Sequence, residues 1–96
     1  MSYVFEVNDK TGRKIRATKE QWKHLMKRHS YMEKYIEEIK ETLKSPDKVV
    51  SDSLDKGYYY KSYKYLTSPN HFILVIAKYL NGEGFVITAY LEENIK

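Results

Sequence analysis

Three histidines are the residues of this chain best suited to acid–base chemistry, because imidazole gains and loses a proton near neutral pH. His24 and His29 fall in one predicted helix, and His71 precedes a predicted strand. A spacing of five residues does not place His24 and His29 on one helix face, as a spacing of four would. The chain has no cysteine and no His-Glu-x-x-His motif, so we expect no metal site and no cofactor.

Each histidine also has a purely structural interpretation. His29 ends the apolar stripe of the predicted helix, where a half-buried histidine can satisfy the last carbonyl groups and favour the helix dipole. His24 lies on the other side of the helix from Trp22, so we expect it to be a solvated surface residue. His71 is left without an assigned role.

Two hydroxyl groups interrupt the last apolar segment, FVITAYL. Thr88 and Tyr90 are two residues apart, so a strand places both on one face. We expect Val86 to share that face, and Phe85, Ile87, Ala89 and Leu91 to form the other one. The two hydroxyls either line a cleft that holds an anion or follow from strand propensity, with the tyrosine ring buried and its oxygen in water.

Lys61 lies between two tyrosines in the segment GYYYKSYKYL. Tyr59, Lys61 and Tyr63 share one face of the predicted strand. A cation flanked by phenols can hold a phosphate, but a lysine can equally face water on an edge strand and discourage aggregation. The pattern leaves both interpretations open.

The composition fits a small soluble domain that binds a polyanion, and it fits equally a mildly basic soluble protein whose tyrosines follow their strand propensity. The 96 residues carry a net charge of +4 and include ten tyrosines, so cations can neutralise phosphates while rings stack on bases. We expect a single domain over residues 1–96. The longest apolar run, FILVIA, is far shorter than the roughly 20 residues of a membrane helix. No segment resembles a signal peptide, so we expect a cytoplasmic protein without a membrane partner.

The elements that position these residues follow from local patterns. Alternation around the turn NDKTG predicts an N-terminal hairpin. Thr18 and Gln21 form a capping box that starts a helix through His29. A second helix follows in MEKYIEEIKETLKS, and strands are predicted at 48–54, 57–66, 71–80 and 85–91. Together these predict an α+β fold, with the hairpin and two helices packed on one face of a four-stranded antiparallel sheet.

The whole series of segments resembles a known family. The segments are RKIRAT, EQWKHLMKRH, EEIKETLKSPDKV, YYYKSY and FVITAYLEENIK, in that order. They are similar to the phage-associated branch of the barnase/EndoU/colicin/RelE-like nuclease superfamily, which comprises small toxin-type RNA-cleaving domains. The most specific pieces are W-x-H-x-x-x-x-H at residues 22–29 and FVITAY at 85–90. Relatives commonly have proline where this chain has Ser30.

The resemblance implies a metal-independent endoribonuclease with RNA as its partner. In such chemistry the ribose 2′-hydroxyl attacks the adjacent phosphate and leaves a cyclic phosphate and a 5′-hydroxyl end. His24 and His29 would then be acid and base candidates, and Lys61 would neutralise phosphate charge, with Arg28 as a second cation. Thr88 and Tyr90 would donate hydrogen bonds to phosphate oxygens.

The RNA-binding residues expected beside this catalytic set are Arg28, Tyr59 and Tyr63. Kinship also suggests a protein antitoxin or immunity partner, whereas the oligomeric state is not predicted. The alternative is a non-catalytic module of the same fold that binds RNA or a protein, for example by adding an edge strand.

Overall fold

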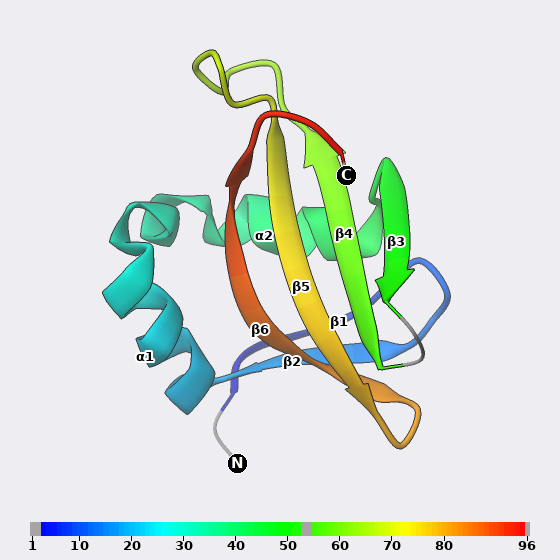
Figure 1. Cartoon of the computed structure of the whole chain (residues 1–96). Coiled ribbons are helices and arrows are strands. Elements are labelled where there is room, and N and C mark those ends of the chain that lie inside the picture. The colour runs from blue at the N-terminus through cyan, green and yellow to red at the C-terminus, as the bar shows by residue number, and fades with distance from the viewer. Residues whose placement is uncertain (1–2, 53–54, 96) are drawn as a thin grey trace.

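A six-stranded mixed sheet is the frame of this protein, whose computed structural model describes residues 3–52 and 55–95 (Figure 1). The order of strands in the sheet is β1-β2-β6-β5-β4-β3. The elements are β1 (Tyr3–Asn8), β2 (Lys14–Thr18), α1 (Lys19–Arg28), the 3₁₀ helix η1 (Ser30–Tyr35), α2 (Ile36–Lys44), β3 (Lys48–Asp52), β4 (Lys56–Ser62), β5 (Phe72–Leu80) and β6 (Glu83–Glu92).

The predicted α+β class is confirmed, but the predicted four-stranded antiparallel sheet is wrong. The strands β3 to β6 do pair antiparallel. The N-terminal hairpin joins them, because β2 pairs in parallel with β6 through Ile15–Gly84 and Arg16–Phe85. Gly84 makes this approach feasible, since a Cβ atom there would lie 2.4 Å from Cδ1 of Ile15. No local sequence feature of either strand predicts a pairing partner so distant in the chain.

The hairpin itself forms as its turn residues predict. Oδ1 of Asp9 accepts hydrogen bonds from the backbone amides of Thr11 and Arg13, each at 2.9 Å. Gly12 adopts a φ of +90°, a backbone conformation that glycine takes without steric cost. This turn returns the chain so that β2 lies antiparallel to β1.

The predicted start of α1 is confirmed, whereas the second helix is divided. The Thr18 hydroxyl accepts a hydrogen bond from the amide of Gln21 at 3.2 Å, as an N-cap does. The segment predicted as one helix from Met32 begins in η1 and continues as α2. The tighter winding of η1 carries Met32 into the core, where it is fully buried. Positions 53–54, the end of one predicted strand, lie outside the described residues.

The core lies between α2 and one face of the sheet. Ile39 and Leu43 of α2 are fully buried with Ile73 and Val75 of β5. Figure 1 shows α2 crossing behind β4 and β5 and α1 lying beside β6, while no helix of the described chain covers the opposite face of these strands. None of the described helices is long and apolar enough to cross a membrane.

A β-bulge in β6 changes which residues share a face. Ile76 pairs with Thr88 but Ala77 pairs with Val86, so β6 carries Ile87 as an extra residue. Val86 therefore lies in the core together with Ala89, and the predicted grouping of Val86 with Thr88 is wrong. Thr88 and Tyr90 do share a face, which is the one opposite the core.

Candidate active site

A cavity of about 450 Å³ lies between α1 and β6. It is lined by Gln21, His24, Leu25, Arg28, His29, Ile87, Thr88 and Tyr90. Both histidines of α1 and both hydroxyl residues of the last strand are among them, although more than fifty residues separate the two groups in the chain. The cavity therefore brings together most of the side chains that the sequence analysis identified as catalytic or RNA-binding candidates.

The helix presents His24 to this cavity through a second face that the sequence analysis did not identify. Gln21, His24, Leu25 and Arg28 follow the i, i+3, i+4, i+7 spacing of one helix face. Trp22 is turned the other way, against Phe5 of β1, with their ring centroids 6.1 Å apart. His24 is exposed as expected for a surface residue, yet it is a cavity residue as well.

His29 lines the same cavity because it lies beyond the last helical residue of α1. It is the C-cap of α1, with φ −136° and ψ 58°, so helical spacing no longer fixes its direction. Its backbone amide donates to the carbonyl of Leu25 at 2.7 Å, whereas the side chain satisfies no helix carbonyl in the described chain. His24 and His29 therefore line one cavity despite their five-residue spacing.

Two tyrosines hold the His29 ring in place. The ring centroid lies 5.3 Å from that of Tyr90 and 5.8 Å from that of Tyr31. Nδ1 of His29 contacts the Tyr31 hydroxyl at 3.4 Å. Within the described residues Nε2 has no hydrogen-bond partner, which leaves that nitrogen able to exchange a proton with a ligand.

Tyr90 and Thr88 offer hydroxyl groups on the β6 side of the cavity. Burial, followed by the nearby Glu92 carboxylate and neighbouring phenols, raises the pKa of Tyr90 above its ordinary value. Tyr90 is therefore a neutral phenol at neutral pH and can donate a hydrogen bond to an anion. The Thr88 hydroxyl has no partner among the side-chain hydrogen bonds of the described chain, so it can donate in the same direction.

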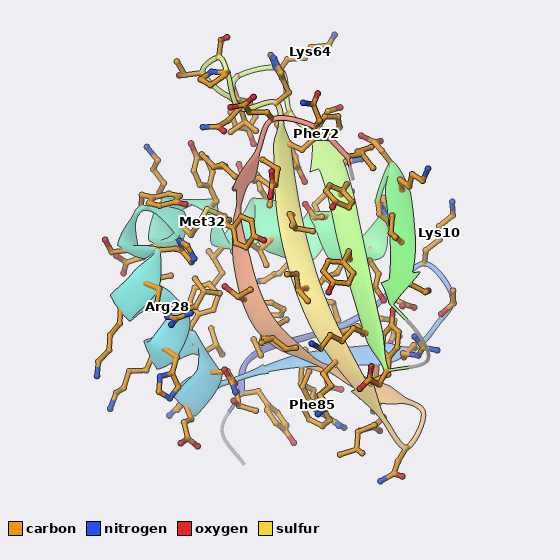
Figure 2. The ribbon with its side chains drawn as sticks, viewed as in Figure 1. Lys10, Arg28, Met32, Lys64, Phe72 and Phe85 are labelled. Carbon is orange, nitrogen blue, oxygen red and sulfur yellow. The ribbon has the colours of Figure 1, made fainter. Side chains whose placement is uncertain are left out.

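The electrostatic character of the cavity is cationic. Arg28 is exposed, and Figure 2 shows it on α1 beside β6. None of the described residues that line the cavity is aspartate or glutamate, so no lining carboxylate opposes an entering anion. No group of three or more described His, Asp or Glu residues is arranged to hold a metal ion.

The structure does not bring Lys61, Tyr59 or Tyr63 into this cavity. Nζ of Lys61 donates to the Ser45 carbonyl at the end of α2, at 2.9 Å. The Tyr63 hydroxyl donates to the Glu38 carbonyl at 3.0 Å. All three lie on the α2 side of β4, as their shared face predicted, and their contacts there are with the protein itself.

Tyr59 belongs to a different cavity, at the turn of the hairpin. Its hydroxyl donates to Oδ2 of Asp9 at 2.7 Å and lies 2.8 Å from the Tyr79 hydroxyl. Arg13 stacks on the Tyr79 ring, 3.7 Å from its centroid. These contacts join the turn of the hairpin to β4 and β5.

Sequence reasoning missed Gln21, Tyr31 and Ile87 at the site. Gln21 was visible through its spacing from His24 and Arg28, which a search for a second helix face would have found. Ile87 enters the cavity wall at the bulge, and Tyr31 meets His29 only because η1 follows α1 directly. Neither of these two placements has a local signal.

Comparison with known proteins gives one family. The family model described as phage-Barnase-EndoU-ColicinE5/D-RelE like nuclease2 matches residues 4–94. No significant match to the chain was found among curated proteins or among solved structures. The family match confirms the resemblance that the ordered segments of the sequence indicated.

Proposed function

We propose, from the premise that the chain belongs to the phage-Barnase-EndoU-ColicinE5/D-RelE like nuclease2 family, that it is a metal-independent RNA endonuclease. The observation that carries the proposal is the cavity between α1 and β6. It combines two imidazoles, a guanidinium, a phenol and a hydroxyl. These are the groups that phosphodiester transesterification needs: a base, an acid, and donors for the developing charge.

The proposed reaction begins at the ribose 2′-hydroxyl. One imidazole accepts the 2′-hydroxyl proton as the oxygen attacks phosphorus, and the other donates a proton to the departing 5′-oxygen. The P–O5′ bond breaks as the P–O2′ bond forms, so the products are a 2′,3′-cyclic phosphate and a 5′-hydroxyl end. His29 is the more firmly oriented of the two imidazoles because the rings of Tyr31 and Tyr90 contact it.

The remaining groups stabilise charge on the phosphorane. Arg28 supplies the positive charge that a pentacoordinate phosphate with additional negative charge requires. The phenol of Tyr90, kept protonated by its raised pKa, and the Thr88 hydroxyl donate hydrogen bonds to the non-bridging oxygens. Such donors are effective because they are already oriented before the charge develops.

The test is cleavage of a labelled RNA oligonucleotide in EDTA. We expect wild-type protein to yield cyclic-phosphate and 5′-hydroxyl ends, and to leave DNA of the same sequence intact because it lacks the 2′-hydroxyl. His29→Ala and His24→Ala should each lower kcat/KM by about 10²–10⁴-fold, the usual contribution of a general acid or base. His71→Ala is the matched control, since this exposed histidine lies outside the cavity.

Three outcomes would contradict the proposal. Unchanged cleavage in His24→Ala, His29→Ala and Thr88→Ala would rule out the proposed site. Cleavage that depends on added divalent metal would rule out the proposed mechanism. Salt-sensitive RNA binding without cleavage under any condition would assign the chain to the non-catalytic binding modules of the fold.

A further inference from the structure

The face of the sheet opposite α2 carries a second cavity, of about 370 Å³, which we call the base pocket. Its lining includes Val50, Tyr58, Tyr60, Leu74, Tyr90 and Glu92. The volume falls within the roughly 300–1,000 Å³ typical of small-molecule sites. No helix of the described chain covers this face (Figure 1), so the pocket opens to solvent above the strands.

Strand register explains why aromatic rings gather there. Tyr90 of β6 lies opposite Leu74 of β5, and Leu74 lies opposite Tyr60 of β4. Side chains directly opposite one another share a face and touch. Tyr58 and Thr88 belong to the adjacent row through their common partner on β5. Three phenol rings from β4 and β6 therefore border one hollow.

The base pocket adjoins the candidate active site. Tyr90 lines both cavities, and Thr88 of the first cavity lies in the row of Tyr58. A ligand with its phosphate beside His29 can therefore extend an adjacent group toward the tyrosines. In RNA that adjacent group is a ribose with its base.

We propose that the base pocket binds a nucleobase next to the scissile phosphate and favours bases that carry an exocyclic amino group; this rests on the proposed function. Aromatic rings bind any base by stacking. Glu92 adds selectivity, because a carboxylate only accepts hydrogen bonds. The exocyclic amino group of cytosine, adenine or guanine donates such a bond, whereas the only donor on the pairing edge of uracil is its N3–H, which lies between two carbonyl oxygens that a carboxylate repels.

Glu92 can accept a hydrogen bond from the base in addition to making its contacts inside the protein. A carboxylate has about four lone-pair directions over its two oxygens, so it can accept several hydrogen bonds at once. Glu92 lies at the end of β6, opposite Phe72 of β5, and Figure 2 shows Phe72 near the upper end of that strand. The carboxylate is therefore at the rim of the pocket, where the edge of a stacked base would lie.

The test compares two matched ligands by NMR titration of the isotope-labelled full chain. Cytidine and uridine monophosphates, as 3′- and 5′-isomers, differ in the base at position 4, where an amino group replaces a carbonyl oxygen, and at N3, which accepts in cytosine and carries a hydrogen in uracil. We expect cytidine monophosphate to bind at least about tenfold more tightly in one isomer series, as a hydrogen bond to a charged group supports. The perturbed amide signals should include those of Val50 and Leu74.

Variants separate stacking from selectivity. Tyr58→Leu should weaken the binding of both nucleotides by about tenfold, because stacking is lost. Tyr58→Phe keeps the ring and should therefore keep the affinity. Glu92→Gln should abolish the preference for cytidine, because a side-chain amide both donates and accepts. Tyr65→Leu is the control, since this exposed tyrosine lies in the loop between β4 and β5.

Equal affinity for the two nucleotides, or unchanged affinity in Tyr58→Leu, would overturn the base pocket. Binding is measured without turnover, so the result is distinguishable from that of the cleavage assay. Nucleotide selectivity without RNA cleavage would support the pocket and contradict the catalytic proposal. Cleavage by a protein whose pocket signals do not respond to either nucleotide would do the reverse.

Discussion

Replacing Tyr59 by phenylalanine tests whether the contacts at the hairpin turn stabilise the fold as the structure indicates. The substitution removes only a hydroxyl, because the ring stays in a site where Tyr59 is 1% exposed. It deletes the donor of the 2.7 Å bond to Asp9 and the 2.8 Å contact with Tyr79. Asp9 is itself 7% exposed, so water replaces the lost donor poorly.

The expected loss at neutral pH is about 2 kcal/mol of unfolding free energy. Hydrogen bonds to charged groups contribute about 1.5–3 kcal/mol, and a buried acceptor left without its donor keeps its desolvation cost. For a domain near this size, 1 kcal/mol shifts Tm by about 4–8 °C, so the expected fall is about 8–16 °C. Tyr65→Phe is the control, because it also removes a phenol donor to a carboxylate, that of Glu38, but at a 61% exposed tyrosine where water can replace the donor. We expect a loss of less than about 0.5 kcal/mol there.

The loss should also depend on pH in a defined direction. Burial raises the pKa of Asp9, but hydrogen bonds from Tyr59, Thr11 and Arg13 outweigh burial and hold it below its ordinary 3.8. A lowered pKa contributes stability that is present above 3.8 and is lost as pH falls through the folded-state value. Removing one of these donors should weaken that contribution, so wild type and Tyr59→Phe should converge in strong acid.

The assay is urea unfolding followed by circular dichroism at a series of pH values, for wild type and both variants. A cost of Tyr59→Phe below about 0.5 kcal/mol at neutral pH, within the range of surface substitutions, would show that this hydroxyl does not stabilise the fold. A cost that grows as the solution is acidified would show that Asp9 is not the charged partner of the hydroxyl.

Three further predictions concern the candidate active site and the sheet. Arg28→Ala should reduce the slope of log affinity against log salt for single-stranded RNA by about 0.7, the value for one phosphate contact; an unchanged slope in a filter-binding titration would exclude this contact. The kcat/KM for RNA cleavage should pass through a maximum with pH, because one imidazole must be neutral and the other protonated; a profile that rises continuously would contradict the paired roles of His24 and His29. Gly84→Ala should destabilise the fold by about 1–3 kcal/mol in urea unfolding through overpacking, because the new Cβ would lie 2.4 Å from Cδ1 of Ile15. Stability equal to that of the wild type would show that β2 and β6 do not pack this closely.

Local signals in the sequence were sufficient for most of the elements. Thr18 marks the start of α1 because a side-chain oxygen next to free helix amides needs no distant partner. The turn at Asp9 and the apolar run of β5 are equally local. The ordered series of segments was also sufficient for the family, as the match over residues 4–94 confirms.

The candidate site was predictable only in part. Residue type singled out His24, His29, Thr88 and Tyr90, and the family resemblance implied their catalytic roles. The structure places all four in one cavity. Lys61 was nominated on the same grounds but caps α2 instead. Residue type indicates which chemistry a side chain can perform, whereas its neighbours decide which role is open to it.

Tertiary structure alone decided the topology of the sheet and the two cavities. The pairing of β2 with β6 depends on contacts across almost seventy residues, and the bulge at Ile87 appears only when β5 supplies the opposing register. That bulge turns Val86 into the core while Thr88 and Tyr90 face the open side. Helix starts and turns are determined by neighbours in the chain, but strand partners and the direction of a residue beyond a helix end are determined by packing, which brings together residues far apart in the sequence.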